Sequence, residues 1–191
     1  MFLTHFKLTS QPFAERVAAD SLWPDDRMRQ GLARLRYLAD QATVGLLTGA
    51  SGVGKSALLK RFLHELAGPQ YEAVYLHLTH LPAAGLLKLL VAKLGEIPRR
   101  GKDRLFEQIL DKARRCEGLL LLVLDEAHLL DADALTDLRL LISSALDDAP
   151  PLKLVLAGQE PLRHTLRQSR EEVMRLIISP GGAGVRGRDP P

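Results

Sequence analysis

One short segment largely dictates how this chain must fold, because it matches the pattern G-x-x-x-x-G-K-[ST] at every fixed position. The segment reads GASGVGKS and runs from Gly49 to Ser56. A β-favouring run, residues 43–48, precedes it, and an apolar pattern of helical period, residues 54–66, follows it. The order strand, glycine-rich loop, helix predicts a phosphate-binding loop rather than an ordinary glycine-rich turn with an incidental lysine.

Each residue type in such a loop has a task toward a nucleotide. The glycines let backbone N–H groups face the phosphates, Lys55 reaches the β- and γ-phosphates, and the Ser56 hydroxyl holds Mg²⁺. We therefore predict ATP and Mg²⁺ as the ligands of this segment. The predicted nucleotide-binding residues are Gly49, Ala50, Ser51, Gly52, Val53, Gly54, Lys55, Ser56 and Ala57.

Segments of strand and helix character alternate along the rest of the chain. Such alternation predicts an α/β fold, a three-layer sandwich in which helices cover both faces of a mostly parallel central sheet. The run LLLLVL offers no polar face to water, which places it near the middle of that sheet. Besides residues 43–48, strands are predicted at residues 73–78, at 119–124, which is the run LLLLVL, and at 152–157. Besides residues 54–66, helices are predicted at residues 25–38, 83–94, 102–116 and 133–146.

Two carboxylates follow the strand predicted at residues 119–124. Ligands of open α/β sheets lie at the carboxyl ends of the strands, so Asp125 is the predicted metal-side carboxylate. Glu126 is the predicted general base, which takes a proton from the attacking water. The alternative is a solvated acidic turn after a core strand, and the presence of the phosphate-binding loop favours the catalytic interpretation.

The predicted strand at 152–157 ends close to Gln159. A parallel neighbour that ends at the same sheet edge brings Gln159 near the γ-phosphate and the water, where it acts as a polar sensor. The alternative is a helix-entry residue without nucleotide contact. For His128, two residues after Glu126, packing or capping is the favoured interpretation over catalysis.

Bulk properties set further bounds. An apolar share of 46% over 191 residues suffices for one packed domain, and a formal net charge of +3 only mildly favours an acidic partner. Cys116 is the single cysteine, so no intrachain disulfide is possible, and a reducing, cytoplasmic location is expected. The apolar run of residues 119–124 is too short for a membrane span, and no signal peptide is predicted.

The chain resembles AAA+ ATPases of the ExeA type, a group that includes the secretion ATPase ExeA and the transposition ATPases TniB and TnsC. The resemblance covers roughly residues 2–166. An additional strand between the two motifs, with a glutamate beside the aspartate, looks like the additional-strand division of P-loop ATPases. The likeness rests on HFKL (5–8) with Pro12-Phe13, TGASGVGKSALL, LLLVLDEAHLL and LKLVLAGQEPLR.

The resemblance implies three parts: residues 1–40 flanking the nucleotide pocket, an ATPase core at 41–170, and an atypical tail at 171–191. In the tail we expect disorder, with residues 173–178 as an alternative short edge strand. The helical lid and the arginine that reaches a neighbouring subunit have no clear counterpart here, Arg163, Arg167 and Arg170 being weak substitutes. ATP hydrolysis is therefore expected to be impaired if that arginine is needed.

The resemblance also implies an accessory ATPase of DNA transposition that forms a ring or filament of like subunits and contacts duplex DNA and a transposase. Arg99, Arg100, Lys102 and Arg104 are candidate phosphate contacts, against the alternative of an ordinary solvated helix connection. The other candidate functions are an ExeA-like secretion ATPase, which needs a membrane span, and a truncated nucleotide-binding remnant with little hydrolysis.

Overall fold

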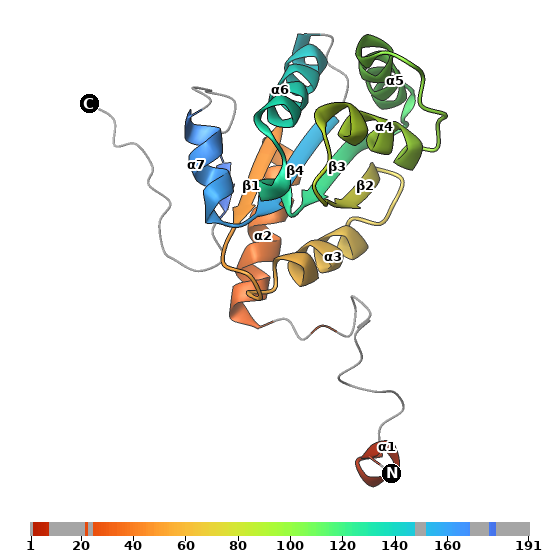
Figure 1. Cartoon of the computed structure of the whole chain (residues 1–191). Helices are drawn as coiled ribbons and strands as arrows, with labels where there is room; N and C mark the ends of the chain where they lie inside the picture. The colour runs from red at the N-terminus through yellow and green to blue at the C-terminus, as the bar shows by residue number, and fades with distance from the viewer. Residues whose placement is uncertain (1, 8–21, 23–24, 148–151, 169–175, 179–191) are drawn as a thin grey trace, which may run out of the picture.

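A computed structural model describes residues 2–7, 22, 25–147, 152–168 and 176–178 (Figure 1). Its centre is one five-stranded sheet in the order β2-β3-β4-β1-β5, and every paired strand is parallel. The strands are β1 (Val44–Thr48), β2 (Tyr71–His77), β3 (Leu119–Asp125), β4 (Leu152–Gly158) and β5 (Leu176–Ile178). The predicted α/β class with a parallel sheet is confirmed.

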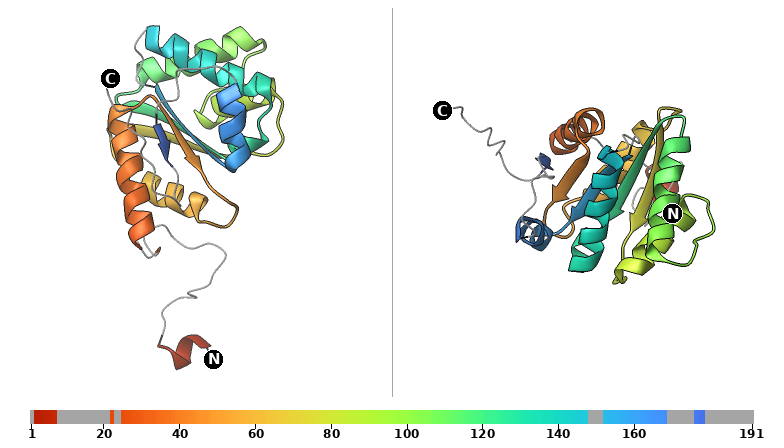
Figure 2. Two further views of the ribbon diagram at one scale, coloured as in Figure 1. Left: turned by 90° about the vertical axis from the view of Figure 1, so that its left-hand side faces the viewer. Right: turned by 90° about the horizontal axis from the view of Figure 1, so that it is seen from above.

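Helices cover both faces of the sheet, as Figure 2 shows from two directions. On one face α2 (Asp26–Gln41) and α3 (Lys55–Glu65) pack against the sheet, and on the other lie α4 (Ala83–Lys93), α5 (Lys102–Arg115) and α6 (Ala132–Asp147). The remaining helices are α1 (Phe2–His5), the short 3₁₀ helix η2 (Ala127–Leu129) and α7 (Glu160–Gln168). These layers are those predicted for a three-layer sandwich.

The β3 strand shows why the sheet needs both helical layers. Its side chains alternate between the two faces, so that Leu121 and Val123 join the core under α2 and α3, whereas Leu120, Leu122 and Leu124 join the opposite core. All five are fully buried. The prediction that this strand lies inside the sheet is confirmed, although the central position of the five belongs to β4.

A close approach between α2 and β1 depends on a glycine. A Cβ atom on Gly45 would lie 1.7 Å from Leu38 Cδ1, so only a residue without a side chain lets α2 pack at this distance. Asp25 caps the helix, since its side chain accepts a hydrogen bond of 2.7 Å from the Met28 amide. The helix predicted before the phosphate-binding loop thus becomes one wall of the core.

The sheet brings the carboxyl ends of its strands to one edge. Thr48 is the register partner of Gly158, and His77 is the partner of Asp125. In space, β4 separates β1 from β3, which agrees with the additional-strand division inferred from the sequence. The loop after β1 and the acidic pair at the end of β3, Asp125 and Glu126, therefore meet across the end of β4.

The two ends of the chain bear on earlier expectations. Leu176–Ile178 pairs with β1 as the edge strand β5, inside the range 173–178 that was given as an alternative edge strand. The other residues of 171–191, and Pro12 and Phe13 of the N-terminal segment, lie outside the described residues. Among the described residues no helical lid follows the sheet.

In the part of the chain that the structure describes, none of the helices has the length and apolar character needed to cross a membrane.

Candidate nucleotide site

The phosphate-binding loop connects β1 to the first residue of α3. Gly52 has a φ of 79° and Gly54 a φ of 90°, the left-handed region that glycine adopts without strain. A Cβ atom at either position would meet no atom within 4 Å, so backbone conformation rather than space requires these glycines. The side chain of Lys55, which is 5% exposed, folds back so that Nζ donates to the carbonyl oxygens of Gly49 at 3.0 Å and Ala50 at 2.8 Å.

Asp125 is the centre of the polar network at this sheet edge. Its side chain is completely buried, and its Oδ2 accepts a hydrogen bond of 2.5 Å from Ser56 Oγ. The Glu126 amide donates to the other oxygen, Oδ1, at 2.9 Å. The fold therefore brings together the two predicted metal-binding side chains, which are 69 positions apart in the sequence.

Two further side chains, both from β2, reach the same carboxylate. Tyr75 Oη donates to Asp125 Oδ2 at 2.8 Å, and His77 Nδ1 lies 3.6 Å from the same oxygen. Sequence reasoning missed both, because it treated β2 only as an additional strand. The signal was present, since polar and aromatic residues two positions apart at the end of a parallel strand face the same edge as the ligands.

The environment of Tyr75 keeps its phenol protonated. Burial of the ring raises the pKa of Tyr75 well above its ordinary value, and the hydrogen bond to Asp125 raises this pKa further. The hydroxyl is consequently a hydrogen-bond donor over the whole physiological pH range.

Glu126 is the N-cap residue of the short helix η2 and has the left-handed conformation, with a φ of 58°. A non-glycine residue in this region is uncommon and often marks a functional position. Its Oε2 lies 3.3 Å from His128 Nδ1. A quarter of the Glu126 side chain is exposed, so water reaches the carboxylate that we predict to be the general base.

Gln159 follows β4 directly, and its backbone N–H points to His128 Nδ1 at 3.4 Å. His128 thus lies between the predicted base and the end of the predicted sensor strand. The structure brings Gln159 to the same edge as Asp125 and Glu126 through its backbone, and the role of its amide side chain stays a prediction.

The donor set suits Mg²⁺ bound together with nucleotide phosphates. Mg²⁺ is usually held by one or two protein oxygens plus waters and phosphates rather than by a cage of protein ligands. Here one hydroxyl, that of Ser56, and one buried carboxylate, that of Asp125, lie at hydrogen-bond distance. No group of three or more His, Cys, Asp or Glu side chains suited to a metal occurs in the described ranges.

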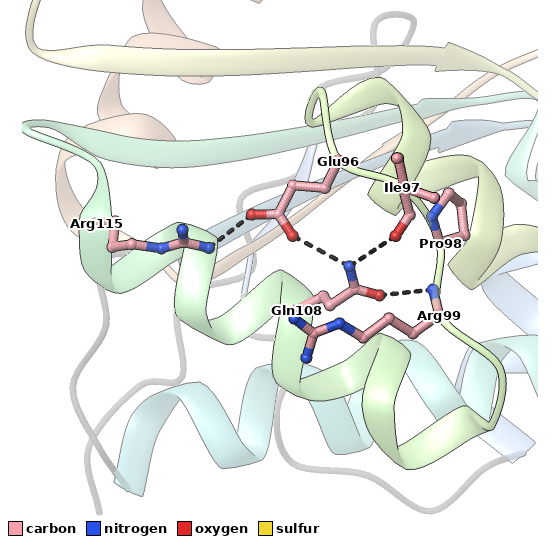
Figure 3. A pocket seen from close by; sticks show the side chains of 6 residues that line it. All are labelled: Glu96, Ile97, Pro98, Arg99, Gln108 and Arg115. Atoms are coloured by element: carbon pink, nitrogen blue, oxygen red, sulfur yellow. Dashed lines mark hydrogen bonds and ion pairs between the residues drawn. The ribbon is translucent and has the colours of Figure 1, made fainter.

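The candidate DNA-contacting loop lies between α4 and α5, beside a pocket of about 630 Å³ (Figure 3). The buried side chain of Gln108 holds this loop in place. Its Nε2 donates to Glu96 Oε2 at 3.2 Å and to the Ile97 carbonyl at 3.0 Å, and its Oε1 accepts from the Arg99 amide at 2.9 Å. Arg115 Nη2 contacts Glu96 at 2.6 Å. The loop is therefore an ordered part of the fold.

One of the four basic residues assigned to that loop has a structural partner. Lys102 Nζ forms an ion pair with Oδ1 of Asp137, a carboxylate of α6 that is 1% exposed. A buried carboxylate without a counter-ion is costly, so Lys102 is committed to the packing of α5 on α6. The hypothesis of a four-residue phosphate contact stays a prediction, and Lys102, although exposed like Arg99, Arg100 and Arg104, also has this structural role.

Comparison with known families identifies one match over most of the core. The family model described as "AAA domain" matches residues 38–166. This range contains β1 to β4, the phosphate-binding loop and the acidic pair at the end of β3. A search among curated proteins found no match.

Several solved structures share the fold. Cdc6p of Pyrobaculum aerophilum superposes with a TM-score of 0.69 at 20% identity, over 88% of this chain and 48% of that protein. A Walker-type ATPase of Pyrococcus abyssi gives a TM-score of 0.62 at 18% identity, over 88% and 57%. The ORC1 protein of Aeropyrum pernix, solved in complex with DNA, gives 0.63 at 16% identity, over 84% and 46%. The chain spans about half the length of these structures.

Proposed function

Because this chain belongs to the AAA domain family of P-loop ATPases, we propose that it binds ATP with Mg²⁺ and hydrolyses the ATP to ADP and phosphate. The observation that carries the proposal is the 2.5 Å contact between Ser56 and the buried Asp125. It joins the end of the phosphate-binding loop to the acidic pair at the end of β3, and the proposed reaction requires both. The core at residues 41–170 is the part we assign to this chemistry.

The chain's own groups divide the work of binding and proton transfer. Amides of the loop from Gly49 to Ala57 and the positive end of α3 receive the phosphates. Lys55 then exchanges its contacts with the Gly49 and Ala50 carbonyls for phosphate oxygens. Ser56 and Asp125 are the residues that would hold Mg²⁺, which would supply positive charge to stabilise the negatively charged phosphates.

Glu126 acts as the general base toward the attacking water. The Glu126 carboxylate is partly exposed and follows Asp125 directly in the sequence. Water therefore reaches it beside the proposed metal site, where it can accept a proton. The left-handed backbone of Glu126 supports this role, since uncommon backbone conformations of non-glycine residues cluster at active sites. Gln159 is proposed to sense the γ-phosphate from the end of β4.

The test compares ATP turnover and nucleotide affinity in the parent chain and in Glu126→Gln. General-base catalysis contributes about 10²–10⁴-fold, so turnover falls by that factor while nucleotide affinity stays within about twofold. Glu117→Gln changes an exposed glutamate just before β3, at the opposite end of this strand from Glu126; it is the matched control and keeps parental turnover. Equal turnover in both variants contradicts the role of Glu126. Binding without turnover in the parent contradicts hydrolysis and leaves a nucleotide-binding protein.

For the biological role we propose an accessory ATPase of DNA transposition that assembles with copies of itself, on duplex DNA, and acts with a transposase. The support is the sequence resemblance to that group and a positively charged, ordered loop between α4 and α5. A DNA complex is known for the similar ORC1 fold of Aeropyrum pernix. An ExeA-like secretion ATPase is the alternative, and it predicts no response to DNA.

Duplex DNA added to the turnover assay separates the two roles. Under the transposition role DNA stimulates turnover, and the effect weakens steeply with salt because phosphate contacts release counter-ions. Neutralising Arg99, Arg100 and Arg104 together reduces the salt dependence of DNA affinity, whereas Lys102 is left intact because of its pairing with Asp137. A parent chain that neither binds DNA nor responds to it contradicts the transposition role.

A further inference from the structure

The carboxylate of Asp125 is held by donors from three separate segments. The Glu126 amide occupies Oδ1 at 2.9 Å, while Ser56 Oγ at 2.5 Å and Tyr75 Oη at 2.8 Å both donate to Oδ2. A completely buried carboxylate with these partners is restricted to a single orientation, because any rotation of the group breaks at least one charge-assisted hydrogen bond.

The direction of each hydrogen bond determines what the network offers to a cation. The Tyr75 phenol and the Ser56 hydroxyl each direct a proton at Asp125, since an ionised carboxylate only accepts. With its proton engaged in this way, Ser56 Oγ has its lone pairs free to face a metal ion. The hydrogen bond from Tyr75 holds the Asp125 carboxylate in its orientation. That carboxylate in turn determines the direction in which the Ser56 hydroxyl points its proton.

From this network we infer that Tyr75 is a positioning residue for the Mg²⁺ site, which orients Asp125 and, through Asp125, the metal-binding lone pairs of Ser56. The inference rests on the proposed function and deepens it. In this inference Tyr75 acts through its hydrogen bond to Asp125 rather than as a metal ligand. Groups that hold a metal-binding carboxylate commonly change metal affinity by 10- to 100-fold when they are removed.

The strand β2 supplies both the test and its control. Tyr75 is the register partner of Val123, and its ring packs against the buried core under α2 and α3, so Tyr75→Phe removes the hydroxyl and keeps the packing ring. Tyr71, four residues earlier on β2, packs against the same core. Its hydroxyl donates instead to the exposed Asp40 at 3.2 Å, away from Asp125, which makes Tyr71→Phe the matched control.

The experiment measures the affinity of a fluorescent, non-hydrolysable ATP analogue as Mg²⁺ is raised, starting from EDTA. For Tyr75→Phe we expect the Mg²⁺ concentration at half-maximal enhancement to rise about tenfold, with unchanged affinity in EDTA. Tyr71→Phe follows the parent curve. Asp125→Asn and Ser56→Ala, which alter the proposed ligands themselves, lose most of the Mg²⁺ enhancement.

Three outcomes overturn the inference, and each has a different meaning. If Tyr75→Phe follows Tyr71→Phe, the hydroxyl has no role toward the metal. If its affinity falls equally in EDTA and in Mg²⁺, the hydroxyl only supports the fold. If Asp125→Asn and Ser56→Ala also keep the full Mg²⁺ enhancement, the metal site of the proposed function fails together with the inference. If the parent chain shows no ATP turnover but Tyr75→Phe still shifts the Mg²⁺ dependence of nucleotide binding, only the proposed hydrolysis is refuted.

Discussion

Replacing Lys102 with methionine tests the assignment of this residue to the fold rather than to a ligand. The variant leaves the Asp137 carboxylate, 1% exposed, without its counter-ion, and its Oδ2 has no hydrogen-bond partner in the described part of the chain. Removal of one partner from a fully buried ion pair costs about 3–5 kcal/mol. Since half of the Lys102 side chain is exposed, solvent screening reduces the expected loss of unfolding free energy to about 2 kcal/mol.

Urea unfolding followed by circular dichroism measures this loss. With an m-value of about 2 kcal/mol per molar, the midpoint of Lys102→Met falls by about 1 M. Arg104→Met is the matched control, because Arg104 is an exposed cation in the same first turn of α5, and it changes stability by less than about 0.5 kcal/mol.

A double variant isolates the mechanism. Lys102→Met combined with Asp137→Leu removes both charges, and a buried ion pair exchanged for apolar residues is often neutral or stabilising. The double variant is therefore expected to recover at least half of the loss. Equal stability of Lys102→Met and Arg104→Met, or a double variant less stable than Lys102→Met, refutes the reasoning and returns Lys102 to the group of candidate DNA contacts.

Two further predictions concern packing and pH. Gly45→Ala places a methyl group where Leu38 Cδ1 lies and is expected to cost about 3 kcal/mol in urea unfolding, with Gly45→Ala/Leu38→Ala less destabilised than the sum of its single variants; additive losses contradict the contact. Burial, followed by the hydrogen bond from Cys116 to Glu72, raises the pKa of the Cys116 thiol from 9.0 to about 11. Because the folded state holds this proton more strongly than the unfolded chain, its stabilising contribution is fully present below about pH 9 and is lost as the pH rises toward 11. Alkylation of Cys116 at pH 8 is therefore about 100-fold slower in the folded protein than in urea, and equal rates contradict the assignment.

The locally coded features of this protein followed from its sequence. The pattern from Gly49 to Ser56 indicates a phosphate-binding loop, since its glycines and lysine act within one strand-loop-helix unit. The interior position of β3 followed from the run LLLLVL for a similar reason, as a strand without a polar face needs cover on both sides. The direction of each strand and the edge that collects the ligands followed from the same alternation.

The tertiary structure alone decided which distant side chains meet. Tyr75 reaches Asp125, and Lys102 pairs with Asp137 instead of standing free, because strand order, register and helix packing set these contacts. The spacing of residues along the chain does not predict these contacts. Tyr75 and Asp125 are 50 positions apart and become neighbours only because β2 and β3 pair in one particular register. For the edge strand the sequence offered residues 173–178 only as an alternative, and pairing with β1 decided that Leu176–Ile178 forms β5. Sequence patterns thus located the groups that carry the chemistry, and packing chose the partners that orient them.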